Sequence, residues 1–181
     1  MTATPDPADS PWKEALAGLF PEFLAFYFPL AHQGIDWRAG HEFLDQELAQ
    51  VVQDAELGRR LVDKLVQIRP IAGGDAWVYV HVEIQGHSQA GFAERLFVYN
   101  YRLFDRYRKP VATLALLADD APGWRPSRFG FELFGCRHEL IFPAVKLLDY
   151  APRLPALLED PNPFALLRAR EFLLWERPWP R

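Results

Sequence analysis

The segment that decides the fold covers residues 61–86 and reads LVDKLVQIRPIAGGDAWVYVHVEIQG. Residues 61–68 are mainly apolar and β-branched, and residues 76–85 give the strongest strand pattern in the chain. Between the two runs, Pro70 and the Gly-Gly-Asp sequence at 73–75 break the pattern. Two strand patterns around a glycine-rich break predict a β-hairpin.

The two expected strands carry acidic residues at positions that can meet. Side chains of a strand alternate between its faces, so His81, Glu83 and Gln85 share one face. A turn centred near Gly73 places Asp63 opposite Glu83, to within about a residue. Two carboxylates about 5 Å apart destabilise a sheet unless something offsets their charge, and Mg²⁺ prefers such oxygen ligands. The alternative that stays open is that both are polar residues on a solvent-exposed face.

Hydrophobic spacing predicts helices on both sides of this hairpin. Before it, a helical period is found in residues 11–20, 23–30 and 41–60. After it, residues 90–108 again have a helical period, and Pro110 is expected to end that helix.

Three further segments predict strands. Residues 111–118 are almost all apolar and lie between Pro110 and a pair of aspartates, which is typical of a buried strand. Residues 129–134 and 139–142 predict two more strands. Helices that cover a mixed central sheet make an α/β (α+β) sandwich, and this order of elements excludes a helix bundle and an all-β barrel.

The chain is expected to divide into three segments. Residues 1–10 are acidic and Pro-rich and are predicted to be disordered, whereas residues 11–150 form the folded core. Residues 151–181 contain six of the 16 prolines and are predicted to be a poorly packed tail with one helix near residues 164–175.

Composition narrows the class of protein. Half of the 181 residues are hydrophobic and 24% are charged, which excludes an intrinsically disordered chain. The net charge is −4, but 16 arginines against 4 lysines favour local phosphate contacts. The single cysteine, Cys136, excludes an intramolecular disulfide framework and is expected to be a buried thiol. The sequence shows no signal-peptide or membrane-span pattern, which predicts a soluble, cytoplasmic protein with no membrane partner.

The helix expected after the hairpin carries a basic and aromatic face. Arg95, Tyr99, Arg102 and Arg106 recur at intervals of four, three and four residues, so they share one side of the helix. Guanidinium groups with an interleaved aromatic ring suit a nucleic-acid backbone and a base or sugar face. The alternative is an ordinary solvated face of paired charges with a core tyrosine.

Taken together, Asp63, the sequence Glu83-Ile84-Gln85 and the Arg/Tyr-rich helix form an ordered set of motifs. In these motifs the chain resembles the PD-(D/E)XK nuclease superfamily and, within it, the recombination-promoting nuclease (Rpn) and putative transposase-like group. The matching blocks cover most of the chain: they are residues 10–16, 43–45, 62–66, 81–86, 92–95 and 99–102, continuing to 149–150.

The resemblance implies a restriction-endonuclease-like sandwich and a Mg²⁺-dependent DNA endonuclease, with Mn²⁺ as an alternative ion. Asp63 and Glu83 would hold the metal together with the backbone carbonyl of Ile84. Gln85 would stand where the superfamily usually has lysine and would position water or substrate through hydrogen bonds, without a charge. A helical acid, Glu14 or Asp45, would join the site, and the sequence does not choose between them.

Two other functions stay open on the sequence. The first is a nuclease-fold protein that binds nucleic acid or a protein partner without cutting it. The second is a shortened, inactive relative, because the match to the family ends near residue 165. DNA is the expected partner, and whether the chain forms a homodimer is left open.

Overall fold

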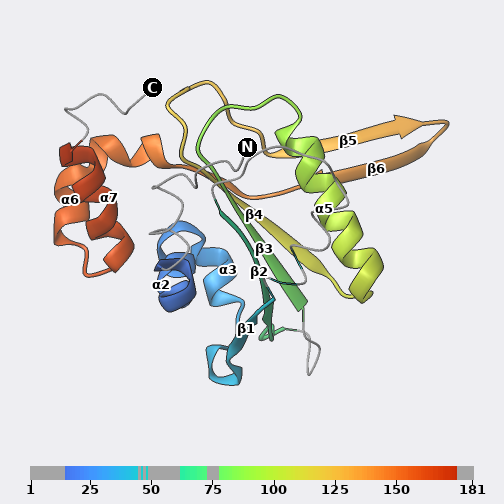
Figure 1. Ribbon diagram of the computed structural model, residues 1–181, viewed down its shortest axis with the longest axis horizontal. Coiled ribbons are helices and arrows are strands. Elements are labelled where there is room, and N and C mark those ends of the chain that lie inside the picture. The colour runs from blue at the N-terminus through green and yellow to red at the C-terminus, as the bar shows by residue number, and fades with distance from the viewer. Residues whose placement is uncertain (1–14, 45, 47, 49–61, 73–77, 175–181) are drawn as a thin grey trace, which may run out of the picture.

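The centre of the computed structural model, which describes residues 15–44, 46, 48, 62–72 and 78–174, is a five-stranded mixed sheet (Figure 1). The strands, in spatial order, are β1 (His41–Phe43), β2 (Val62–Ile68), β3 (Val78–Gln85), β4 (Val111–Leu117) and β7 (Ala144–Lys146). The pairs β1–β2 and β2–β3 are antiparallel, whereas β3–β4 and β4–β7 are parallel. The predicted hairpin is therefore β2–β3, and the predicted buried strand is β4.

Helices cover both faces of this sheet (Figure 1). The helices are α2 (Phe20–Tyr27), α3 (Pro29–Gln33), α5 (Phe92–Tyr107), α6 (Leu154–Glu159) and α7 (Pro163–Leu174), with 3-10 turns η1 (Trp37–Ala39) and η2 (Leu147–Arg153). On one face, Phe20 and Phe23 of α2 pack with Val82 of β3 in the larger core. On the other, Phe92 of α5 packs with Leu117 of β4. The mixed sheet flanked by helices confirms the predicted α/β (α+β) class.

Helix α5 confirms the helical period expected over residues 90–108. Its buried residues recur at helical spacing and are Phe92, Arg95, Leu96, Tyr99 and Leu103. Gly91 precedes it with a φ of 77°, which glycine adopts without a steric penalty. The helix ends at Tyr107, because Pro110 follows and disfavours helical backbone before it.

The two later strands pair with each other and form a separate sheet. β5 (Arg128–Leu133) and β6 (Cys136–Ile141) make an antiparallel hairpin that extends past α5, away from the central sheet (Figure 1). Its turn residues Phe134 and Gly135 have φ of 52° and 79°, as in a two-residue hairpin turn with positive φ at both positions. The expectation of a buried Cys136 thiol is wrong: Cys136 is exposed, because it lies beside the turn of this projecting hairpin.

The predicted tail is packed over its described part. Phe164 is 1% exposed, and its ring lies 5.4 Å from that of Phe23, between centroids. Asn162 Nδ2 donates to the Glu22 carbonyl at 2.9 Å, which ties the start of α7 to α2. The expectation of poor packing is therefore wrong for residues 151–170, whereas the predicted helix near residue 164 is confirmed as α7. The prolines did not prevent packing because Pro155 and Pro163 stand in first turns, where proline is tolerated.

Two of the predicted segments lie partly or wholly outside the residues that the structure describes. The predicted helical period over 41–60 begins instead with strand β1, and most of that segment lies outside the described residues, as does the predicted disordered segment 1–10. Among the helices that the structure describes, none is both long and apolar enough to cross a bilayer.

Candidate functional site

The register of β2 and β3 brings the two predicted acidic positions together. Asp63 is the Cα partner of Glu83, and Gln67 is the partner of Tyr79 on the same ladder. This confirms the prediction that the acids are cross-strand neighbours. Paired positions of an antiparallel ladder belong to the same face of the sheet, so Asp63 and Glu83 occupy one face.

That face is the one covered by α5. Leu65, two positions from Asp63 along β2, is buried in a cluster with Leu103 of α5 and Tyr79 of β3. The side chains of Asp63, His81 and Glu83 lie outside the described part of the structure, as do residues Glu14 and Asp45. The register thus places the acidic pair beneath α5, and the ligand set of a metal at this pair stays a prediction.

At the end of β3, Gln85 is held by the first turn of α5. Its side chain is buried, with Gln85 1% exposed. The amide oxygen Oε1 accepts from Arg95 Nη2 at 2.7 Å, and the amide nitrogen Nε2 donates to the His87 carbonyl at 2.9 Å. Gln89 Oε1 completes the group, because it accepts from Arg95 Nη1 at 2.5 Å and lies 3.5 Å from Gln85 Nε2. The predicted water- or substrate-positioning role would use the one lone pair that these contacts leave on Oε1.

The four residues predicted to contact nucleic acid are not equally accessible. Arg95 is 3% exposed and Tyr99 is fully buried, whereas Arg102 is half-buried and Arg106 is exposed. The basic side of α5 thus begins against the sheet and reaches solvent toward the C-terminal end of the helix. Of the predicted set, Arg102 and Arg106 are placed where a phosphate backbone could meet them. The nucleic-acid contact itself stays a prediction.

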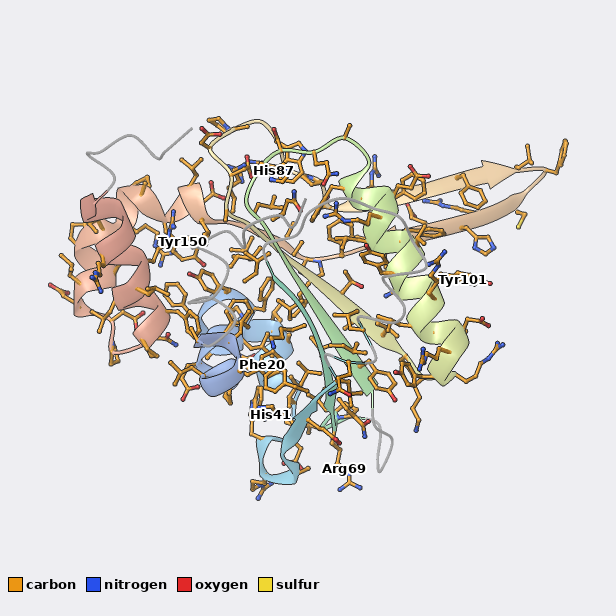
Figure 2. All side chains as sticks on the ribbon, viewed as in Figure 1. Phe20, His41, Arg69, His87, Tyr101 and Tyr150 are labelled. Carbon is orange, nitrogen blue, oxygen red and sulfur yellow. The ribbon has the colours of Figure 1, made fainter. Side chains whose placement is uncertain are left out.

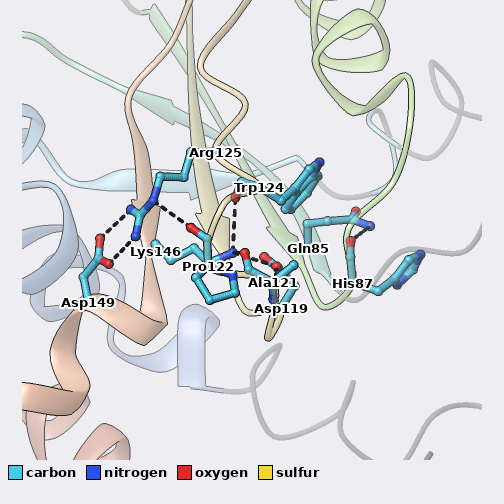
Figure 3. Close-up of polar contacts among 9 residues, drawn as sticks. All are labelled: Gln85, His87, Asp119, Ala121, Pro122, Trp124, Arg125, Lys146 and Asp149. Carbon is cyan, nitrogen blue, oxygen red and sulfur yellow. Dashed lines mark hydrogen bonds and ion pairs between the residues drawn. The ribbon is translucent and has the colours of Figure 1, made fainter.

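A buried ion pair that sequence reasoning missed lies beside Gln85 (Figure 3). Lys146 Nζ donates to Asp119 Oδ1 at 2.6 Å, and both side chains are 1% exposed. The same ammonium donates to the carbonyls of Ala121 and Trp124 at 2.7 and 3.2 Å, so all three of its protons have acceptors. The Ala121 N–H also donates to Asp119 Oδ1, at 2.9 Å.

Strand topology explains why these groups meet. Leu117 pairs with both Gln85 of β3 and Lys146 of β7, and the three strands run parallel, so their carboxyl ends lie at one edge. Asp119 follows β4 at the same edge. One sequence signal could have found it: an aspartate two residues after an almost all-apolar strand, where we expected only a boundary.

A second, exposed ion pair joins the segment between β4 and β5 to η2 (Figure 3). The guanidinium of Arg125 donates to both oxygens of Asp149, at 2.6 and 2.7 Å, with about half of each side chain exposed. The hydrogen bond from Arg125 holds the pKa of the Asp149 carboxyl below its usual range. Next to it, burial raises the pKa of the Tyr150 hydroxyl.

The described side chains include no group of three or more histidine, cysteine or carboxylate residues that could hold a metal ion. Since the Asp63 and Glu83 side chains are outside that set, the finding does not bear on the predicted site. Comparisons with protein-family models, with curated proteins and with solved structures return no match in any of the three. The resemblance to the PD-(D/E)XK nucleases therefore remains a hypothesis carried by the motifs of the chain.

Proposed function

We propose that the protein is a Mg²⁺-dependent DNA endonuclease of the recombination-promoting, transposase-like type. The observation that supports it most is the direct pairing of Asp63 with Glu83 on the α5 side of the sheet. Two carboxylates at paired positions repel one another, and a divalent cation removes that cost. Their oxygens are also the ligands that Mg²⁺ prefers.

The residues of the proposed site would divide the work of phosphodiester hydrolysis. Asp63 and Glu83, with the Ile84 carbonyl, would hold the ion, and Mn²⁺ would substitute for it. A bound Mg²⁺ supplies a water of lowered pKa and stabilises negative charge on the phosphate. Gln85 would orient that water or the substrate with a neutral hydrogen bond, and its amide is held in one orientation by Arg95 and His87.

The proposed DNA contact comes from the solvent-reaching end of α5. Arg102 and Arg106 would pair with phosphates, while Arg95 and Tyr99 hold the helix against the sheet. A net charge of −4 favours contact through such a local group over binding by the whole surface.

Cleavage of supercoiled plasmid DNA tests the proposal. We expect nicking with Mg²⁺ or Mn²⁺, loss of nicking with EDTA, and a drop of at least about 100-fold in the variants Asp63→Asn and Glu83→Gln. Glu42→Gln is the matched control, since it makes the same chemical change at an exposed position of β1 in the same sheet. Nicking that persists in EDTA, or that Asp63→Asn leaves intact, would refute the metal mechanism.

A thermal-shift measurement separates metal binding from cleavage. Mg²⁺ at about 100 times its dissociation constant stabilises the folded state by about 2.7 kcal/mol, or roughly 5–10 °C for a chain of this size. Asp63→Asn should raise the Tm without metal, because it removes one of two like charges, and should abolish the Mg²⁺ shift. A Mg²⁺ shift that is equal in the two proteins would place the ion elsewhere.

A second candidate is a nuclease-fold protein that binds DNA without cutting it. It is favoured by Gln85, which brings no charge where the superfamily usually has lysine and whose amide is already engaged by Arg95. This candidate would be supported over the endonuclease if the protein retards DNA in a mobility-shift assay and shows a Mg²⁺ thermal shift but does not nick plasmid DNA.

A further inference from the structure

The outer side of α5 and one face of the β5–β6 hairpin meet in an apolar surface, which we call the arm face together with the turn residue Phe134. Its residues are Phe97, Tyr101 and Phe104 of α5, the alternating residues Phe129, Phe131 and Leu133 of β5, and Phe134 of the turn that follows. The Phe97 ring joins the two parts, since its centroid lies 5.4 Å from that of Phe129 and 6.1 Å from that of Phe131. Figure 2 shows Tyr101 on the side of α5 that faces away from the central sheet.

Five side chains of the arm face are exposed to solvent although they are large and mainly apolar. The exposed fractions are 98% for Phe134, 61% for Leu133, 59% for Tyr101, 54% for Phe131 and 46% for Phe104. With about 200 Å² for each such side chain, these five expose roughly 600 Å² of mainly apolar surface. This area is as large as the largest apolar patch on a typical monomer. With a polar rim added, it approaches the roughly 800 Å² that each partner buries in a standard interface.

The hairpin also needs support that the described part of its own chain supplies only in part. A two-stranded hairpin alone is marginally stable in water. Within the described residues it belongs to a two-stranded sheet, and α5 contacts it at β5. A second copy of the chain that packs on the exposed face of the hairpin would supply the missing support.

The charge of the arm selects among partners. Residues 128–141 carry two arginines, Arg128 and Arg137, and two glutamates, Glu132 and Glu139, so their charges cancel. Arg137 and Glu139 already pair with one another on β6. A neutral, apolar arm has little attraction for a phosphate backbone, and two such arms do not repel each other.

We propose that the arm face is a homodimer interface, in which the hairpin of each copy lies against the arm face of a second copy of this chain. Phe134 is the proposed anchor of the interface, because it is almost fully exposed at the tip of the arm. The inference does not rest on the nuclease activity, since it uses no residue of the metal or nucleic-acid site.

One substitution separates the interface from folding. Phe134 has a φ of 52°, a conformation that asparagine tolerates, and Asn-Gly is a favoured two-residue hairpin turn. Phe134→Asn should therefore leave the hairpin folded while it removes the anchor. The matched control is Leu30→Asn, which replaces another apolar side chain that is 84% exposed, in helix α3 on the face of the central sheet opposite to α5 (Figure 1).

Sedimentation equilibrium of the full chain over a concentration series measures the outcome. We expect a species of twice 20.9 kDa with a dissociation constant of about 1 µM or tighter. Phe134→Asn should weaken the dimer at least about tenfold, Leu133→Arg should weaken it further, and Leu30→Asn should match the wild type. A wild-type chain that stays at 20.9 kDa throughout would overturn the proposal. Equal dissociation constants for Phe134→Asn and Leu30→Asn would also overturn it. A monomeric wild type in which Phe134→Asn weakens DNA binding would overturn it too and would assign the arm to nucleic acid.

Discussion

The buried pair of Asp119 and Lys146 gives the sharpest test of how this edge of the sheet is stabilised. Lys146→Met keeps most of the side-chain volume but removes the ammonium that donates to Asp119 and to the carbonyls of Ala121 and Trp124. The Asp119 carboxylate then keeps only the Ala121 N–H among its described donors, in a site where it is 1% exposed. Removal of one partner from a buried ion pair costs about 3–5 kcal/mol, because the other charge stays buried.

For a chain of this length, that cost corresponds to a drop in Tm of about 10 °C, measurable by circular dichroism or calorimetry. The double variant Asp119→Leu, Lys146→Met should lose less than Lys146→Met alone, because it leaves no buried charge behind. The double-mutant cycle thus separates the cost of an orphaned carboxylate from the net contribution of the pair.

Arg125→Met is the matched control, because the same loop contains an equally short ion pair that is half exposed. Solvent screens such a pair, so the variant should keep its Tm within about 2 °C of the wild type. If Lys146→Met falls within the same range, then burial does not set the energetics of this edge and the reasoning is wrong.

Three further predictions follow from described contacts. Burial raises the pKa of the Tyr150 hydroxyl above its usual value of about 10. The unfolded chain therefore loses this proton first, and the stability of the folded chain should fall as pH rises above about 10. The tyrosinate absorbance of the wild type, compared with that of Tyr150→Phe, checks the raised pKa. Asn162→Ala should cost about 1–2 kcal/mol in urea unfolding, because Asn162 accepts from the Phe164 N–H and donates to the Glu22 carbonyl. Gly130→Ala should reduce the protection of amide protons from hydrogen exchange in β5 and β6 but not in β2 and β3. The reason is that a Cβ at Gly130 would meet the backbone of His138 and Glu139. Unchanged protection in the hairpin would contradict the expected clash.

The register of the central hairpin could be predicted because several local signals agree. The alternation of apolar residues defines the two strands, and the break between Pro70 and Asp75 limits where the chain reverses. Those two facts place Asp63 within about a residue of Glu83, and the structure pairs the two residues directly. The helical period of α5 is equally accessible to prediction, because a period of 3.6 residues is an internal property of the helix. Its buried face is not, since Arg95 and Tyr99, which we expect at a nucleic-acid contact, are buried.

Other features depend on contacts that no local period encodes. A strand pattern does not say which strand it pairs with, so the separation of β5–β6 from the central sheet, and with it the exposure of Cys136, was not foreseen. The Gln85–Arg95 bond joins residues ten positions apart through a loop whose path sequence does not define. The C-terminal prolines predict loose packing only as long as their position is unknown, since proline in a first turn is compatible with a packed helix.

Helix α5 connects the two proposals, and its two sides can be perturbed one at a time. Its inner side holds Tyr99 and Arg95 against the sheet, and Asn100 Nδ2 donates to the Val111 carbonyl at 2.9 Å. Its outer side presents Phe97, Tyr101 and Phe104, which belong to the arm face. Phe134→Asn changes nothing on the inner side, and Asp63→Asn changes nothing on the outer side. A helix anchored by buried side chains on one face is a rigid support for the other, so the two substitutions should have additive effects on stability unless dimer formation also orders the site. Non-additive effects would show that assembly and the acidic site are coupled through this helix.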